Sequence, residues 1–219
     1  MSDARPTIDR WLPSPRAMRF TAILLGVELA LALVYTAVFR PTVLEPRYAV
    51  YPFVWITAAV LAVAFTRPAP NPLRRRVPAM AVGVAYFLVL TWVGGMLAPG
   101  HVVTGLRIRW LPPGWGPALT YGGAWVRLTL FPFKLVGYLG LAYLVYATVL
   151  DAATSAVSGL LGLVSCVSCT WPVAASLLTG LLGGTSAVAS VVYAWSYDLS
   201  TLVFLVAVLL LYWRPTIGR

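Results

Sequence analysis

The chain has 219 residues, of which 60% are hydrophobic and only 10% are charged, whereas charged residues make up about 25% of an average soluble domain. So few charges cannot cover the surface of a water-soluble protein of this size, and the composition therefore indicates an integral membrane protein. The net charge of +10 comes from basic residues between or at the ends of apolar runs, a placement that suits anionic lipid headgroups and argues against nucleic acid as a partner.

Four apolar runs have the length needed to cross a bilayer, since about 20 helical residues span a hydrocarbon core of about 30 Å. We predict membrane-spanning helices at residues 20–39, 48–66, 77–98 and 131–150. The polar segment 1–19 lacks the features of a cleavable signal peptide, so we expect the first run to be retained as a helix.

Residues 99–130 form the longest polar interruption and are rich in Pro, Gly and Trp. Trp110, Trp115 and Trp125 suit the headgroup layer, where an amphipathic ring has both an apolar and a hydrated side. We expect an ordered interfacial loop here rather than a soluble domain.

The C-terminal region, residues 151–213, does not divide into spans of full length. Pro172 and the pair Gly183-Gly184 interrupt it, which leaves pieces at 154–165 and 172–182 of about 17 Å of helix each, half a membrane. We predict a broken or re-entrant helix followed by a last span that ends near Trp213. The chain is then a single all-α membrane domain with about six transmembrane helices, or seven if both pieces are extended.

Basic residues predict the orientation of these helices. The segment 1–19 and the connection 67–76 each contain four arginines, whereas the connection 40–47 contains two. Cytoplasmic segments of membrane proteins carry an excess of Lys and Arg. We therefore place the N-terminus and the connection 67–76 in the cytoplasm, and residues 99–130 outside the cell membrane.

The only two cysteines, Cys166 and Cys169, form a Cys-x-x-Cys in the sequence SCVSCTWP, which ends at Pro172. Breaks in membrane helices lie in protein or line a cavity, and in transporters they often mark a binding site. Two thiols at this spacing can bind a soft metal ion such as Cu(I), or they can cycle between dithiol and disulfide. In a third interpretation they are small apolar residues that pack between helices without chemistry.

Acidic side chains within apolar spans are further candidates, because a charge in the membrane is costly. Glu28 lies near the middle of the first predicted span, and Asp198 lies in the last. Either could couple to a proton or a cation; alternatively, Glu28 fixes helix packing through a hydrogen bond and Asp198 is the N-cap of a final helix. Met96 and His101, in GGMLAPGH, could form an outer ligand pair for a metal or could simply be loop residues.

A conventional enzyme is not indicated. The motifs of phosphate-binding loops, zinc proteases and serine hydrolases are absent, and one histidine leaves little acid–base machinery. Zinc is unsuited as well, since it prefers four N or S ligands and the chain has two Cys and one His.

The stretch from LLGLVSCVSCTWPVAASLLTGLLGG through YDLSTLVFLVAVLLLYW resembles uncharacterised multi-pass membrane proteins of halophilic archaea. On Cys166, Cys169 and Pro172 it is also distantly similar to the mercuric-ion transport membrane proteins, in which a cysteine pair precedes a proline and a further helix. Thiols carry Hg(II) in that family, so the resemblance implies a soft-metal site at Cys166 and Cys169. The spacing is also similar to that of the thiol-relay proteins of cytochrome maturation, although those place their two cysteines on different helices.

These observations predict a membrane protein that handles a soft metal ion, Cu(I), through Cys166 and Cys169. By analogy, its partner would be a respiratory oxidase that it supplies or helps to assemble. Two alternatives stay open. One is a membrane thiol–disulfide electron relay, and the other is a non-catalytic structural subunit of a larger membrane complex.

Overall fold

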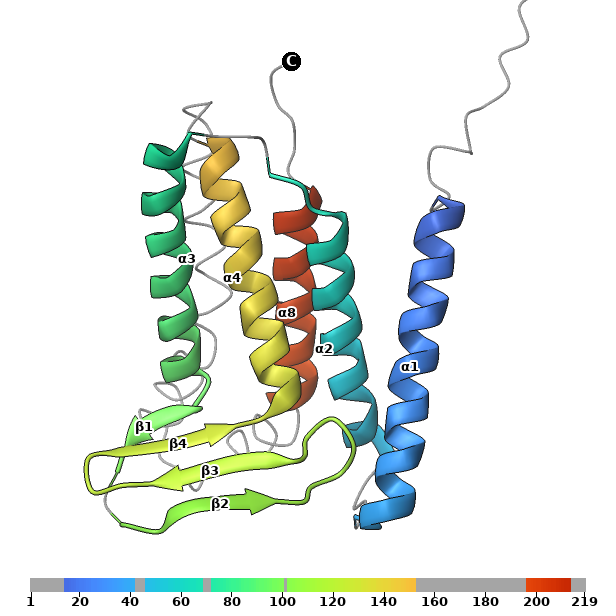
Figure 1. Ribbon diagram of the computed structural model, residues 1–219, viewed down its shortest axis with the longest axis vertical. Helices are drawn as coiled ribbons and strands as arrows, with labels where there is room; N and C mark the ends of the chain where they lie inside the picture. The colour runs from blue at the N-terminus through green and yellow to red at the C-terminus, as the bar shows by residue number, and fades with distance from the viewer. Residues whose placement is uncertain (1–13, 42–45, 69–71, 101, 153–195, 214–219) are drawn as a thin grey trace, which may run out of the picture.

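The computed structural model describes residues 14–41, 46–68, 72–100, 102–152 and 196–213. In this part of the chain, long helices stand side by side and a small sheet lies across one end of them (Figure 1). The helices are α1 (Pro15–Phe39), α2 (Pro46–Phe65), α3 (Leu73–Val93), α4 (Pro132–Ala152) and α8 (Ser196–Trp213).

The first four helices match the four predicted spans, and each is long and apolar enough to cross a membrane. These helices indicate association with a membrane and contact with lipid. α1 starts at Pro15 rather than at residue 20, because Ser14 caps it: the backbone N–H of Ala17 donates to Ser14 Oγ at 3.2 Å. α3 ends at Val93 rather than at residue 98, because the chain turns at Gly94 and enters a strand.

The prediction of an all-α fold is wrong, because a four-stranded antiparallel sheet occupies the stretch that we expected to be an interfacial loop. Its strands lie in the order β1-β4-β3-β2. In chain order they are β1 (Leu97–Pro99), β2 (Gly105–Arg109), β3 (Ala118–Gly122) and β4 (Val126–Leu130). The protein is therefore mostly helical, with a small sheet added between α3 and α4.

Successive side chains of each strand lie on opposite faces of the sheet. The register pairs Leu106 with Tyr121 and Tyr121 with Leu128, which gives the sheet an apolar face. The opposite face carries Arg107, Thr120 and other polar residues of the same register. One face therefore suits contact with lipid or with the helix ends, and the other suits water.

Six or seven transmembrane helices are not supported by the residues that the structure describes. Four helices meet the length and composition of a span, and α8 adds a shorter apolar helix, Ser200–Tyr212. The predicted half-helices at 154–165 and 172–182 lie outside the described residues. α8 does end at Trp213, as the predicted last span does.

The core lies where α2, α4 and α8 meet, and Trp55 of α2 is at its centre. The Trp55 ring stacks on Phe204 of α8 with a centroid distance of 4.0 Å and an interplanar angle of 5°. Phe133 and Tyr138 of α4 contact it edge-on at 5.6 and 6.0 Å. Trp55 Nε1 donates a hydrogen bond to Thr201 Oγ1 at 3.0 Å, so the one polar atom of the ring is satisfied within the core.

Small residues on α4 and α3 let the helices approach closely, as is common in membrane bundles. A Cβ atom placed on Gly140 of α4 would lie 2.8 Å from Ala59 Cβ on α2. A Cβ atom on Gly83 of α3 would lie 3.2 Å from the carbonyl oxygen of Ala142 on α4. The glycines therefore set the distances between α4 and its two neighbours.

The two ends of the bundle differ in the arginines that they expose. The start of α1, the end of α2 and the start of α3 lie at one end, and the sheet lies at the other (Figure 1). The arginine-rich end carries the exposed residues Arg16, Arg19, Arg67, Arg74, Arg75 and Arg76. The sheet end carries the exposed residues Arg40, Arg107, Arg109 and Arg127. We refer to the arginine-rich end as the basic end and to the other as the sheet end.

Candidate functional site

Cys166 and Cys169 of the predicted thiol pair, and His101 of the predicted outer ligand pair, lie outside the described residues. In the described ranges, no group of three or more His, Cys, Asp or Glu side chains lies together. Met96 is fully buried in the hydrophobic core, and its backbone carbonyl accepts a hydrogen bond from the N–H of Thr129 at 2.7 Å. Its side chain therefore packs within the bundle at the junction of α3 and the sheet.

Glu28 lies midway along α1 and is only 8% exposed. Its Oε2 accepts a hydrogen bond of 2.9 Å from Thr57 Oγ1, near the middle of α2. Its Oε1 is buried and has no hydrogen-bond partner among the described residues. The helix pair therefore holds a carboxyl group at mid-depth with one oxygen satisfied and the other not.

A groove of about 390 Å³ begins at Glu28 and lies between α1, α2 and the loop at 113–117. Glu28 is the only charged residue among the described residues that line it, and Tyr35, Phe39 and Phe53 give it aromatic walls. Phe39 follows Glu28 by 11 residues on α1, which corresponds to about 17 Å of helix. The groove therefore extends from the level of the buried carboxyl toward the sheet end of the bundle.

Contacts at several depths position α1 against the rest of the protein. At the sheet end, Tyr35 Oη donates to the carbonyl oxygen of Leu111 at 2.8 Å, and the Phe39 ring stacks on Trp110 at 4.0 Å. At the basic end, Phe20 meets Phe65 edge-on at 5.9 Å. These contacts, with the Glu28 hydrogen bond between them, hold α1 along α2 while leaving the groove open.

Asp198 lies in the first turn of α8, at the sheet end of the bundle. Its Oδ1 accepts a hydrogen bond from Tyr51 Oη of α2. Tyr197 beside it contacts the rings of Tyr48 and Trp115 at 5.8 and 5.2 Å. An acidic residue in a first turn is favourable because it meets the positive end of the helix dipole. Asp198 therefore joins α8 to α2 through a hydrogen bond. It is not among the residues that line the groove at Glu28.

We expect Tyr51→Phe to lower the free energy of unfolding by about 1.5–3 kcal/mol, because it removes the hydrogen bond to a carboxylate that joins α2 and α8. Denaturant unfolding of the detergent-solubilised protein measures this. The matched control is Tyr212→Phe, at a 47% exposed position on α8, which should change stability by less than about 0.5 kcal/mol. Equal effects of the two variants would contradict the role given to Tyr51.

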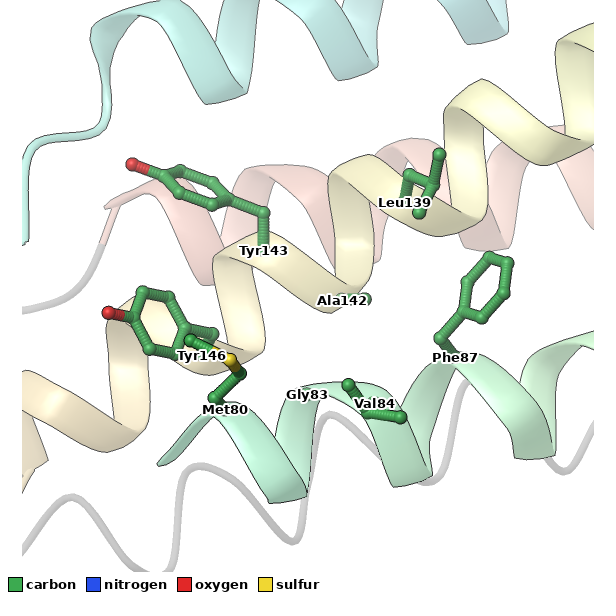
Figure 2. Close-up of a pocket in the computed structure, with 8 residues that line it drawn as sticks. All are labelled: Met80, Gly83, Val84, Phe87, Leu139, Ala142, Tyr143 and Tyr146. Atoms are coloured by element: carbon green, nitrogen blue, oxygen red, sulfur yellow. The ribbon is translucent and has the colours of Figure 1, made fainter. Parts of the chain in front are cut away.

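A second hollow, of about 360 Å³, lies between α3 and α4 (Figure 2). Figure 2 shows Gly83 at its floor, with Met80, Phe87, Tyr143 and Tyr146 around it. No charged side chain lines it among the described residues, and the Tyr143 hydroxyl group donates to the carbonyl oxygen of Thr66 at 3.2 Å. Tyrosine hydroxyl groups are the polar groups of its described lining, and it lacks a charged group to recognise a ligand, so the groove at Glu28 is the stronger candidate.

Reasoning from the sequence identified Glu28 and Asp198 but missed Thr57 and Tyr51, to which they are hydrogen-bonded. Thr57 lies near the middle of an apolar run, and a polar residue at that position could have indicated a partner for Glu28. The proline- and glycine-rich loop at 113–117 that lines the groove could not be predicted from the sequence, because its contact with α1 depends on the fold of the sheet.

Comparison with known proteins identifies a family. The sequence matches the family of unknown function DUF7546 over residues 1–218, while no curated protein and no solved structure gives a significant match. The match carries no information on the Cys-x-x-Cys motif, on halophilic archaea or on mercuric-ion transport. Because it covers nearly the full length, the chain belongs to the DUF7546 family of unknown function.

Proposed function

We propose that this protein is a multi-pass protein of the cell membrane that handles a soft metal ion, Cu(I), through Cys166 and Cys169. The observation that carries the proposal is that the only two cysteines of the chain share a Cys-x-x-Cys before Pro172 in apolar sequence. Thiolates are the ligands that Cu(I) prefers, and it accepts few of them. Copper is the cargo here, and a respiratory oxidase is the recipient that we propose.

The proposed topology has six crossings, with both termini in the cytoplasm and the sheet outside. The arginine-rich end of the bundle supports this orientation, because cytoplasmic segments are enriched in basic residues. α4 ends at the basic end and α8 begins at the sheet end (Figure 1). That arrangement favours an even number of crossings, and so six over seven.

The test is the copper content of protein purified in detergent under reducing conditions, together with the free thiols of a parallel preparation made without reductant, counted before and after reduction. About one Cu(I) per chain, lost in the Cys166→Ser/Cys169→Ser variant, would support the proposal. The matched control is Ser165→Ala/Ser168→Ala, which changes the serines of the same SCVSC sequence and keeps both thiols. It should retain the metal.

The other outcomes decide between the remaining functions. Absence of metal, with two thiols that appear only after reduction, would replace metal handling with a thiol–disulfide electron relay. Absence of metal, with two free and inert thiols, would leave a pair of packing residues and a structural subunit.

A further inference from the structure

We infer that the groove at Glu28 is a binding site for a hydrophobic ammonium ion, a use of the protein that is independent of the thiol pair. Glu28 Oε1 is buried without a hydrogen-bond partner among the described residues. A buried polar atom without a partner is costly, and a buried carboxylate without a positive partner is more so. A ligand that donates a hydrogen bond to Oε1 and carries a positive charge would remove both costs, the unpaired oxygen and the unpaired carboxylate charge.

The lining of the groove selects the rest of the ligand. Apart from Glu28 its described walls carry no charge, and Tyr35, Phe39 and Phe53 supply aromatic rings. Tyr35 and Phe39 lie about two and three turns beyond Glu28 along α1, so their rings can contact the hydrocarbon part of a ligand whose charged group lies at Glu28. The volume of about 390 Å³ lies in the range of small-molecule sites, about 300–1,000 Å³. An apolar chain with one ammonium group at its end fits this combination.

The groove can be reached from the lipid. Leu31 and Val38, two of its lining residues on α1, are each 65% exposed within the described structure. A hydrophobic amine partitions into the bilayer and could therefore enter beside α1. Its ammonium group would then hydrogen-bond to Oε1 while Thr57 continues to hold Oε2.

The experiment measures binding of octylammonium to the full-length protein in lipid nanodiscs, with empty nanodiscs as the reference for partitioning. Octanol is the neutral probe with the same apolar chain. We expect saturable binding of octylammonium and no saturable binding of octanol. Glu28→Gln keeps an acceptor for Thr57 but removes the charge, and we expect octylammonium to bind at least about tenfold more weakly to this variant.

Two further variants separate binding from folding. Glu28→Asp retains the carboxylate and should restore part of the affinity that Glu28→Gln loses. Ala32→Phe leaves Glu28 in place but fills the groove that Ala32 lines, so it should abolish binding while the thermal midpoint stays near that of the wild type. Asp198→Asn is the control for loss of a carboxylate outside the groove and should bind normally.

Three results would overturn the inference. Binding that persists in Glu28→Gln would place the amine elsewhere on the protein. Equal binding of octanol would show that the groove takes a neutral donor. If octylammonium binds the protein in nanodiscs no more than it binds empty nanodiscs, Glu28 would be left with a role in proton coupling or in helix packing.

Discussion

Trp55→Ala is expected to lower the free energy of unfolding by about 3–5 kcal/mol, the cost of truncating a large buried aromatic residue. Trp55 is only 5% exposed and connects α2 with α4 and α8 through Phe133, Phe204 and Thr201. Each aromatic pair adds about 0.5–1.5 kcal/mol beyond the buried area. The alanine variant also leaves the hydroxyl group of Thr201 without the indole donor.

Denaturant unfolding in detergent, followed by circular dichroism, measures the loss. The matched control is Trp92→Ala, because Trp92 lies on α3 and is 57% exposed; its effect should stay within about 0.5 kcal/mol. Trp55→Phe should fall between the two, since it can keep the stacking on Phe204 but loses the hydrogen bond to Thr201, worth about 1 kcal/mol. Equal losses for Trp55→Ala and Trp92→Ala would contradict a core centred on Trp55.

The four long helices were predictable because the bilayer sets their length, and an apolar run of about 20 residues has few other uses. Their ends were less predictable, since a short contact decides each of them. Ser14 extends α1 through one hydrogen bond to the backbone N–H of Ala17, and Gly94 ends α3 before the apolar sequence does.

The sheet was missed although its alternating pattern is present in the sequence. GLRIR and VRLTL both alternate apolar and polar residues, which is typical of a strand with two different faces. The content of Trp, Pro and Gly instead suggested an interfacial loop. β1 and β4 pair across a sequence separation of 31 residues, from Leu97 to Leu128, and such a pairing cannot be predicted from local composition.

Glu28 was predictable as a candidate because charged residues are rare within membrane spans. The side of α1 that faces α2 was not predictable, since lipid and protein interior are both apolar and the sequence of a span need not distinguish its two sides. Thr57 as partner and the groove beside it therefore followed only from the packed arrangement of α1 and α2.

Gly140→Ala is expected to destabilise the protein by about 1–3 kcal/mol, although alanine favours a helix more than glycine does. The added Cβ atom would lie 2.8 Å from Ala59 Cβ, and Ala59 is only 1% exposed on α2. α2 and α4 would have to separate, which also disturbs the packing around Trp55. The same unfolding measurement gives the size of the effect.

Gly26→Ala is the matched control, because a Cβ atom there meets nothing within 4 Å on α1. It should stabilise the protein by about 0.4–1 kcal/mol through the lower entropy of the unfolded chain. Gly83→Ala should lie between the two, since its Cβ atom would come within 3.2 Å of the carbonyl oxygen of Ala142. The opposite signs at Gly140 and Gly26 are the decisive result, because helix propensity alone predicts the same sign at both positions. Stabilisation by Gly140→Ala would show that α2 and α4 are not in close contact at that glycine.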